Sequence, residues 1–560
     1  MAKWGAVIIL GLAQFVMVLD STVMNVSISQ VVEDLNTTVD AMQTAITFYT
    51  LTMAAVMLLG AKLGDLWGRR RAFVIGAIIY AIGSLTTGLA PNFAVLFIGW
   101  SVIEGLGAVL VIPAIAALVA TNYQGRERVT AFAIIGASSG VAVAAGPLIG
   151  GLLTTYASWR YVFIGEVVIM IVVLALARTI TDPSHPKKFR IDMLSVLLSA
   201  AGLILVVYGM LQSKTWGWVL PLYPPEINGH AIEPFGLSLV PYFIVGGGVL
   251  LWWFFVRQRQ LVAQGRPPLV DVSMLSIPRL RAGLSVLSAQ YLITAAIFFM
   301  IPVYLQMTLG LNALQTGLRI FPLSVSLVLF SIVGTRLVSI WSPRRIVRIA
   351  QVILVVASLF LLASVSTELE TLPFGIGMFL AGSALGLLAS QLGNVNMSAV
   401  TEDQTSEVGG LQGVFQNLGS SLGTALIGSV LIGSLATGFL GTVEASTLPE
   451  SVKSQVSESA SGGVDIVPVQ SVNSIAKEAG LSQKEADQLT SIYSDSQISS
   501  LRLSFFFLAL LSIACLLLSK NIPTEILGGR KPRRRRAPLP GPISTRQTSS
   551  EAGDVEPSDG

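Results

Sequence analysis

Long apolar runs recur along the sequence, and their length restricts the fold more than any other feature. A bilayer core about 30 Å thick is crossed by a helix of roughly 20 apolar residues. We place fourteen such runs at residues 5–27, 42–62, 71–90, 92–121, 130–155, 160–180, 192–212, 236–256, 282–305, 315–337, 346–365, 371–400, 407–435 and 500–519. They lack period-two alternation and are too long for barrel strands. An all-α polytopic membrane protein is therefore predicted.

The composition supports this class and excludes others. Only 12% of the 560 residues are charged, about half the share in soluble globular proteins. Soluble enzymes, secreted disulfide scaffolds and nucleic-acid-binding proteins are excluded. The single cysteine, Cys515, cannot form an internal disulfide, and His185 and His230 lack partners at metal-ligand spacing. We therefore expect no metal and no cofactor.

The basic residues predict the orientation. Short cytoplasmic loops carry an excess of Lys and Arg, and with the N-terminus inside, 28 of the 35 basic residues fall at Lys3, in the inner connections or in the C-terminal tail. The other seven lie on the outer side or within spans: Arg160, Lys214, Arg319, Lys453, Lys477, Lys484 and Arg502. Both termini are therefore predicted to be cytoplasmic, as an even number of helices requires.

Two segments stand apart from the apolar runs. Residues 439–499 form a long outer excursion rich in Ser, Glu, Gln and Val, and Ser482 and Glu485 have capping-box spacing before a helical pattern that runs to about Ile498. This excursion is a solvated helical flap, a gate or a partner contact. Residues 520–560 form a basic tail in which Arg530–Arg536 either binds anionic lipid or only anchors the topology, and the part beyond Ala537 reads as disordered.

Three acidic residues stand inside apolar runs: Asp20, Glu104 and Glu166. An ionisable side chain at membrane depth is costly, so it usually faces a cavity or a partner and marks function. A carboxyl group in such surroundings can take a proton from one side and release it to the other. The alternatives remain open: Asp20 as a hydrogen-bonding strut between helices, Glu166 as a hydrated group near the outer surface, and Glu104 as a structural group.

Two glycine-rich motifs carry further information. The first, GAKLGDLWGRRR, lies in the inner turn after the second span and contains Gly64, Asp65, Gly68, Arg69, Arg70 and Arg71. The second, GASSGVAVAAGPLIGG, lies in the fifth span and contains Gly136, Gly140, Gly146, Pro147, Gly150 and Gly151. Small residues allow close helix packing, and a proline bends a helix. Simple packing is the plainer interpretation of each motif, but both patterns are more specific than that.

These motifs resemble the fourteen-helix drug/proton antiporters of the major facilitator superfamily. LDSTVMNVS at 19–27 resembles the family motif of helix 1, GAKLGDLWGRRR the inner signature between helices 2 and 3, and GASSGVAVAAGPLIGG the antiporter motif of helix 5. WRYVFIGEV at 159–167 and PVYLQMTLGLNALQTGLRIFP at 302–322 also match. The resemblance is collinear over most of residues 1–435 and returns at the last helix.

The resemblance implies two six-helix halves with two helices inserted between them. The N-terminal half is then residues 1–185, the inserted pair 186–280, and the C-terminal half 281–519. One departure matters most: the family motif Arg-x-x-Gln-Gly in helix 4 is here Ser101-Val-Ile-Glu104-Gly105. The membrane arginine that is thought to assist proton transfer in the family is lost, and Glu104 becomes a candidate substitute.

The resemblance implies a proton-driven exporter of amphipathic, cationic or lipophilic small molecules that works by alternating access. Proton coupling is assigned to Asp20, Glu104 and Glu166. Candidate cavity residues, each with ordinary packing as the alternative, are Tyr49, Tyr291, Phe298, Gln391, Asn394, Phe415, Gln416 and Asn417. Other open possibilities are export of a specific lipid or natural product, and, more remotely, a channel or a non-transporting sensor. An intramembrane enzyme is excluded because no HExxH or GxSxG motif is present.

We expect the protein to be a multi-pass monomer of a bacterial cytoplasmic membrane. Its expected partners are a small-molecule substrate, protons and membrane lipids. No nucleic acid is expected.

Overall fold

The computed structural model describes residues 4–182, 189–227, 230–338, 340–400, 405–459, 464–522 and 524. Within these residues, fourteen helices are long and apolar enough to cross a membrane, which confirms the predicted fold class. The spans are α1 (Gly5–Val26), α3 (Val39–Trp67), α4 (Arg69–Gly88), α5–η1–α6 (Phe93–Asn122), α7 (Gly125–Tyr156), α8 (Arg160–Ala177), α9 (Met193–Trp216), α10 (Leu239–Ala263), α11 (Pro278–Val303), α12 (Ala313–Leu337), α13 (Pro343–Ala363), α14 (Thr371–Met397), α15 (Thr405–Ala445) and α18 (Gln483–Leu518).

Shorter elements connect or interrupt these spans. They are α2 (Ile28–Asp34), the 3-10 turns η2 (Pro234–Gly236), η3 (Val272–Ser276) and η6 (Ser519–Asn521), the π-helical segments η1 (Phe97–Glu104) and η4 (Tyr304–Thr308), α16 (Glu450–Ser459), α17 (Val469–Glu478), and the hairpin β1 (Glu226–Ile227) with β2 (His230–Ala231). Helices dominate because lipid offers no hydrogen bonds to the backbone, so each span must satisfy its own.

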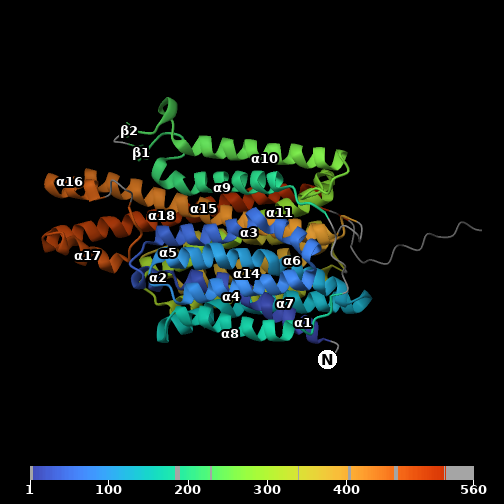
Figure 1. Cartoon of the computed structure of the whole chain (residues 1–560). Coiled ribbons are helices and arrows are strands. Elements are labelled where there is room, and N and C mark those ends of the chain that lie inside the picture. The colour runs from blue at the N-terminus through green and yellow to red at the C-terminus, as the bar shows by residue number, and fades with distance from the viewer. Residues whose placement is uncertain are drawn as a thin grey trace, which may run out of the picture.

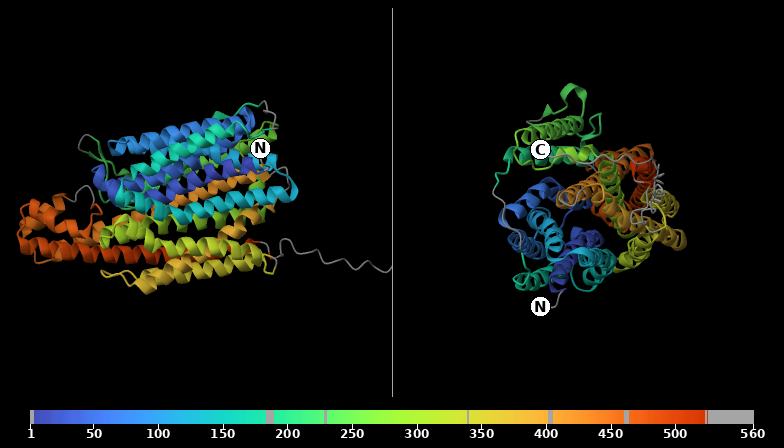
Figure 2. Two further views of the ribbon diagram at one scale, coloured as in Figure 1. Left: turned by 90° about the horizontal axis from the view of Figure 1, so that it is seen from below. Right: turned by 90° about the vertical axis from the view of Figure 1, so that its right-hand side faces the viewer.

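The spans pack as two groups. Helices α1, α3, α4, α6, α7 and α8 contact one another and are called the N-terminal half below; α11–α15 and α18 do so as the C-terminal half. Helices α9 and α10 pair with each other as an inserted pair along one side of the bundle, where α9 also contacts α3 and α15 (Figure 1). In the end-on view of Figure 2 the blue helices of the N-terminal half and the orange and red helices of the C-terminal half lie side by side.

The outer excursion differs from its sequence-based description. The capping box of Ser482 and Glu485 is present, but the helix that it begins does not stop near Ile498; it runs on as α18 to Leu518. Helix α15 likewise continues past its apolar part to Ala445. The two spans thus extend beyond the bundle and carry α16 and α17 between them (Figure 1). The residues of α18 change from polar to apolar along its length, but the helix continues without a break. Its N-terminal capping box and its continuous backbone hydrogen bonds stabilise it throughout.

Two predictions lie outside the described residues. One is the basic tail beyond residue 524, including Arg530–Arg536, and the other is the boundary placed between residues 185 and 186. They stay predictions.

Candidate functional site: a cluster of buried carboxyl groups

The three membrane acids meet inside the N-terminal half. Asp20 comes from α1, Glu104 from the last residue of η1, and Glu166 from α8. All three are buried, and each offers a carboxylate oxygen that lies within 4.8 Å of those of the other two. We call these residues the acid cluster. Each acid was predicted separately from the sequence, and the packing of α1, η1 and α8 brings the three together.

Asp20 and Glu166 each accept hydrogen bonds. The indole N–H of Trp100 donates to both Asp20 oxygens, at 3.0 and 2.9 Å. The Ser84 hydroxyl, from α4, lies 2.9 Å from Glu166 Oε2. Sequence reasoning missed Trp100 and Ser84, because an aromatic or a serine within an apolar run is ordinary in membrane helices.

Glu104 occupies a different environment. Neither of its oxygens has a hydrogen-bond partner among the described residues, nor does the buried hydroxyl of Tyr80, which is close enough to Glu104 to interact with it. Glu104 also ends a π-helical segment, a rare conformation that often occurs at functional sites. Helix α4 presses closely on it, because a Cβ on Gly83 would lie 2.5 Å from the Glu104 nitrogen.

The acid cluster has no basic partner among the described residues. None of the salt bridges in the described part of the chain involves its three carboxyl groups. Ser101, which stands where the resembled motif has arginine, instead donates to the Ala45 carbonyl at 2.8 Å. Like charges at such short range in a low dielectric repel strongly, so the three groups cannot all be ionised at once. The cluster therefore needs protons or another positive charge.

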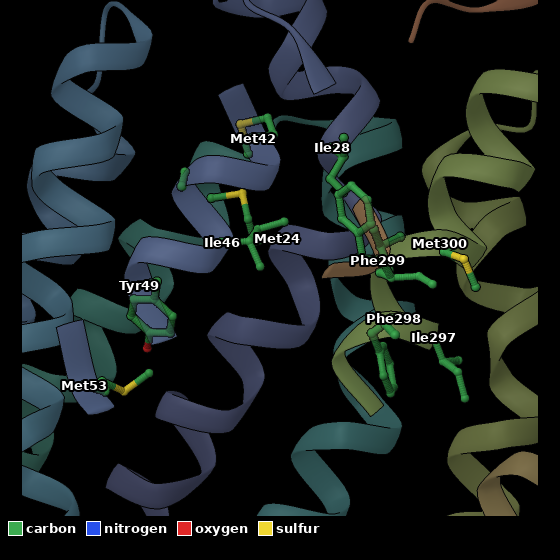
Figure 3. Close-up of a cluster of buried hydrophobic side chains, with 14 of the residues drawn as sticks. Met24, Ile28, Met42, Ile46, Tyr49, Met53, Ile297, Phe298, Phe299 and Met300 are labelled. Atoms are coloured by element: carbon green, nitrogen blue, oxygen red, sulfur yellow. The ribbon is translucent and has the colours of Figure 1, made fainter. Parts of the chain in front are cut away.

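Tyr49 links the acid cluster to the junction between the halves. Its ring stacks on Trp100 with centroids 5.0 Å apart, and its hydroxyl is close to Asp20. Figure 3 shows Tyr49 and Met24 of the N-terminal half in one buried apolar cluster with Phe298 and Phe299 of α11. Two of the predicted cavity residues, Tyr49 and Phe298, thus belong to an apolar cluster with members from both halves.

The other predicted cavity residues are more dispersed. Tyr291 packs against an apolar cluster within the C-terminal half, and Gln391 donates to the Gly334 carbonyl at 3.1 Å. Asn417 donates to the Gly413 carbonyl of its own helix, and Phe415 and Gln416 are partly buried. Asn394 lies in α14, but its side chain is outside the described part of the structure.

The inner turn of the first glycine motif is built around Gly68. Helix α3 ends at Trp67 and α4 begins at Arg69, and Gly68 between them has φ +94°, which disfavours residues with a Cβ. Arg69 lies 4.0 Å from the Asp65 carboxylate and donates to the Ala117 carbonyl at 3.2 Å. The Arg70 backbone N–H donates to Asp182. Gly64 is buried nearby, and Arg71 is exposed.

The second motif packs α7 against two different helices. Cβ atoms added to Gly146 and Gly150 would collide with α1, at Thr22 and Val23 respectively. One on Gly151 would lie 2.6 Å from the Ala313 carbonyl of α12, in the C-terminal half.

Other residues of this motif are less crowded. Gly136 has open space around it and Gly140 only an ordinary contact, whereas the Pro147 carbonyl lies against Gly317 of α12. The outer part of α7 therefore makes a tight contact between the halves.

A family model agrees with this architecture. The model described as "Major Facilitator Superfamily" matches residues 10–424. The chain belongs to the major facilitator superfamily. It is therefore a multi-pass cell-membrane protein of a transporter family, whose members move small molecules and are not enzymes.

Curated relatives include drug-resistance proteins. The chain is 28% identical over 434 residues to the puromycin resistance protein pur8 of Streptomyces alboniger, covering 76% of this chain and 80% of that protein. It is 26% identical to the lincomycin resistance protein of Streptomyces lincolnensis, covering 76% and 84%. It is 25% identical to the multidrug resistance protein Stp of Mycobacterium tuberculosis, covering 74% of each. These similarities support a transporter related to drug-resistance proteins.

Solved structures share the fold. A bacterial homologue of the human lysosomal transporter Spinster, in an inward-facing and unoccupied conformation, matches with TM-score 0.57 at 15% identity, covering 93% of this chain and 97% of that one. A D-xylose–proton symporter matches with TM-score 0.55 at 10% identity, covering 94% and 99%.

Proposed function

We propose that this transporter exports amphipathic, cationic or lipophilic small molecules, such as drugs or antiseptics, in exchange for protons. One observation carries the proposal: three buried carboxyl groups meet in the N-terminal half, and no basic side chain in the described part of the chain pairs with them. Such a group of acids binds protons in a low-dielectric interior and releases them when water reaches it. The resistance proteins among the relatives support export of drug-like cargo.

The hydrogen bonds suggest different tasks for the three acids. Trp100 donates to both oxygens of Asp20 and so supports its ionised form. Among the described residues, neither oxygen of Glu104 accepts a hydrogen bond, although the Tyr80 hydroxyl is near, so Glu104 is the acid that most needs a proton. We assign Glu104 the exchanged proton and Asp20 the more persistent charge, with Glu166 held in place through Ser84.

Tyr49 and Trp100 provide a physical connection between proton and cargo. A substrate held at the apolar junction between the halves would contact Tyr49, which stacks on the indole that binds Asp20. The negative charge of the acid cluster attracts cations across a medium that screens weakly. Loading a proton on Glu104 weakens that attraction, so the protonated transporter holds a cationic substrate less tightly and releases it.

Transport by everted membrane vesicles tests this proposal. Ethidium should accumulate in vesicles that contain the wild-type protein when a proton gradient is applied, and an uncoupler should abolish the accumulation. Glu104→Gln keeps the size of the side chain but cannot titrate, so uphill transport should be lost while ethidium still binds. Glu33→Gln, an exposed residue of α2, is the matched control and should behave as the wild type.

The outcomes separate the parts of the proposal. Uphill transport that persists in Glu104→Gln assigns the coupling elsewhere, and Asp20→Asn then tests the neighbouring acid. If the wild type moves no cation under any gradient, the drug-exporter assignment fails, and export of a specific lipid or natural product becomes the better hypothesis.

A further inference from the structure

A buried lysine stands at the outer end of inserted helix α9. Lys214 is one of the basic residues on the side of the membrane where the positive-inside rule does not require them, and its side chain is only 3% exposed. Burying an ammonium group is costly unless it is paired and hydrogen-bonded. The surrounding side chains therefore indicate what this charge does.

Lys214 connects α9 to the N-terminal half. Its Nζ pairs with the Asp40 carboxylate and donates to Gln43 Oε1 at 3.2 Å, and both partners belong to the first turns of α3. Asp465, on the outer segment between α16 and α17, is also near enough to attract it.

Gln43 carries the connection on to the C-terminal half. Its amide nitrogen donates to the carbonyls of Thr424 and Ala425 on α15, at 3.0 and 3.3 Å. Gly428 leaves room for this amide, since a Cβ there would collide with Gln43. The same side chain thus accepts from the inserted pair and donates to the opposite half.

Apolar contacts and a further hydrogen bond join the same three helices, α3, α9 and α15. An apolar cluster joins Leu203, Val207 and Leu211 of α9 with Leu51 of α3 and Ala425 of α15. The Ser429 hydroxyl of α15 donates to the Met210 carbonyl of α9 at 2.8 Å. Helix α9 therefore covers the line along which α3 and α15 meet, and Lys214 lies at its outer end.

We propose that Lys214 is a positioning residue that holds the outer ends of the two halves together, so that the inserted pair takes part in opening and closing the transporter. This inference rests on the proposed function only in requiring that the outer ends separate during export. When they separate, Gln43 must leave the α15 carbonyls, and water then reaches the Lys214–Asp40 pair. Lys214 therefore stabilises the state that is closed to the outside.

The experiment measures access to the contact between α3 and α15 from outside. Ser421 is buried on α15, and its hydroxyl donates to the Thr47 carbonyl of α3 at 3.2 Å. Ser421→Cys in a Cys515→Ser background gives a single thiol, which is labelled in whole cells with a membrane-impermeant maleimide. Lys214→Gln should raise the labelling rate about tenfold, because a charge-assisted hydrogen bond that favours the closed state is lost.

Two variants keep the test decisive. Lys214→Arg retains the charge and the hydrogen-bond donors and should restore slow labelling. Lys477→Gln, an exposed outer lysine on α17, should label as the reference does. Unchanged labelling in Lys214→Gln overturns the inference, and so does fast labelling that Lys214→Arg fails to slow, since that result means general loosening.

The labelling requires neither substrate nor proton gradient, so the two proposals fail separately. Fast labelling of Lys214→Gln together with a wild type that moves no ethidium leaves the role of Lys214 in place and removes the exporter assignment. Normal proton-driven export together with labelling that is unaffected by Lys214→Gln leaves the exporter assignment in place and removes the role of Lys214.

Discussion

Both halves bury amide and hydroxyl side chains, but among the described residues only the N-terminal half also buries carboxyl groups. The N-terminal half buries carboxyl groups that gather at one point, whereas the C-terminal half buries amides that are spread among its helices. Gln290 donates to the Leu385 carbonyl at 3.4 Å, Gln351 to the Cys515 carbonyl at 2.8 Å, and Gln391 to the Gly334 carbonyl at 3.1 Å. Each of these bonds joins one helix of the half to another.

This difference in buried carboxyl groups explains how two similar helix bundles can have separate roles. An amide cannot titrate, so the buried polar groups of the C-terminal half connect helices without storing protons. A carboxyl group changes its charge, so the N-terminal half can respond to pH and to a cation. We infer that the N-terminal half carries the coupling and the C-terminal half mainly provides a stable partner surface.

The largest expected difference comes from replacing one buried polar side chain in each half by a side chain of similar size. Glu104→Gln keeps the size of the side chain but cannot titrate, and uphill ethidium transport should fall by about 100-fold or more, as when a positioned proton-transfer group is lost. Gln351→Leu removes a hydrogen bond worth about 1 kcal/mol and should leave transport within about twofold. Comparable losses of transport in both variants, at equal amounts of folded protein in the membrane, would contradict the inference that the N-terminal half alone carries the coupling.

The next effect concerns the contact between the halves. A Cβ on Gly317 of α12 would meet the Pro147 carbonyl of α7, a backbone atom that cannot move aside easily. Gly317→Ala should therefore destabilise the packed state by about 1–3 kcal/mol and slow export several-fold, and thermal unfolding in detergent measures the first quantity.

Gly136→Ala, on α7, is the matched control because nothing lies near the added Cβ. It should be neutral, or stabilising by about 0.5–1 kcal/mol, since alanine is the better helix former. Equal effects of the two alanines would show that the halves do not meet at Gly317 in the way described.

The smallest effect belongs to Asp192 at the inner end of the inserted pair, which should affect stability without affecting proton coupling. Hydrogen bonds from Arg257 and Ser195, together with the Arg257 charge, outweigh partial burial and lower the pKa of Asp192 to about 2. A carboxyl group with a lowered folded pKa stabilises the protein above its unfolded pKa, near 3.9. That contribution is lost as the pH falls through about 2.

Asp192→Asn should therefore lower the unfolding temperature at pH 6, and the difference from wild type should shrink between about pH 4 and pH 2. Asp495→Asn, an exposed residue of α18, should show no difference at any of these pH values. Proton-driven export by Asp192→Asn at pH 7 should match that of the wild type. A loss of coupling would show that Asp192 of the inserted pair also takes part in proton coupling.

The acid cluster could be predicted only in part. Asp20, Glu104 and Glu166 stand out because an acid within an apolar run has few structural uses, but their distances from one another depend on how α1, η1 and α8 pack. Trp100, Ser84 and Tyr80 gave no usable signal, because the acids that they approach lie on other helices. Gln391 stays a predicted cavity residue; the structure adds that its amide nitrogen donates to a carbonyl within its own half.

The sequence by itself determined the number of spans and the identity of the membrane acids, and it predicts the orientation of the spans, because hydrophobic length and charge cost are local properties of the chain. Tertiary structure alone decided that the three acids meet and that Lys214 reaches both halves through Gln43. It also decided that α15 and α18 extend beyond the bundle. These features depend on which helices become neighbours, and in a membrane that choice follows from close packing and interhelical hydrogen bonds rather than from hydrophobicity, which is the same on every lipid-facing surface.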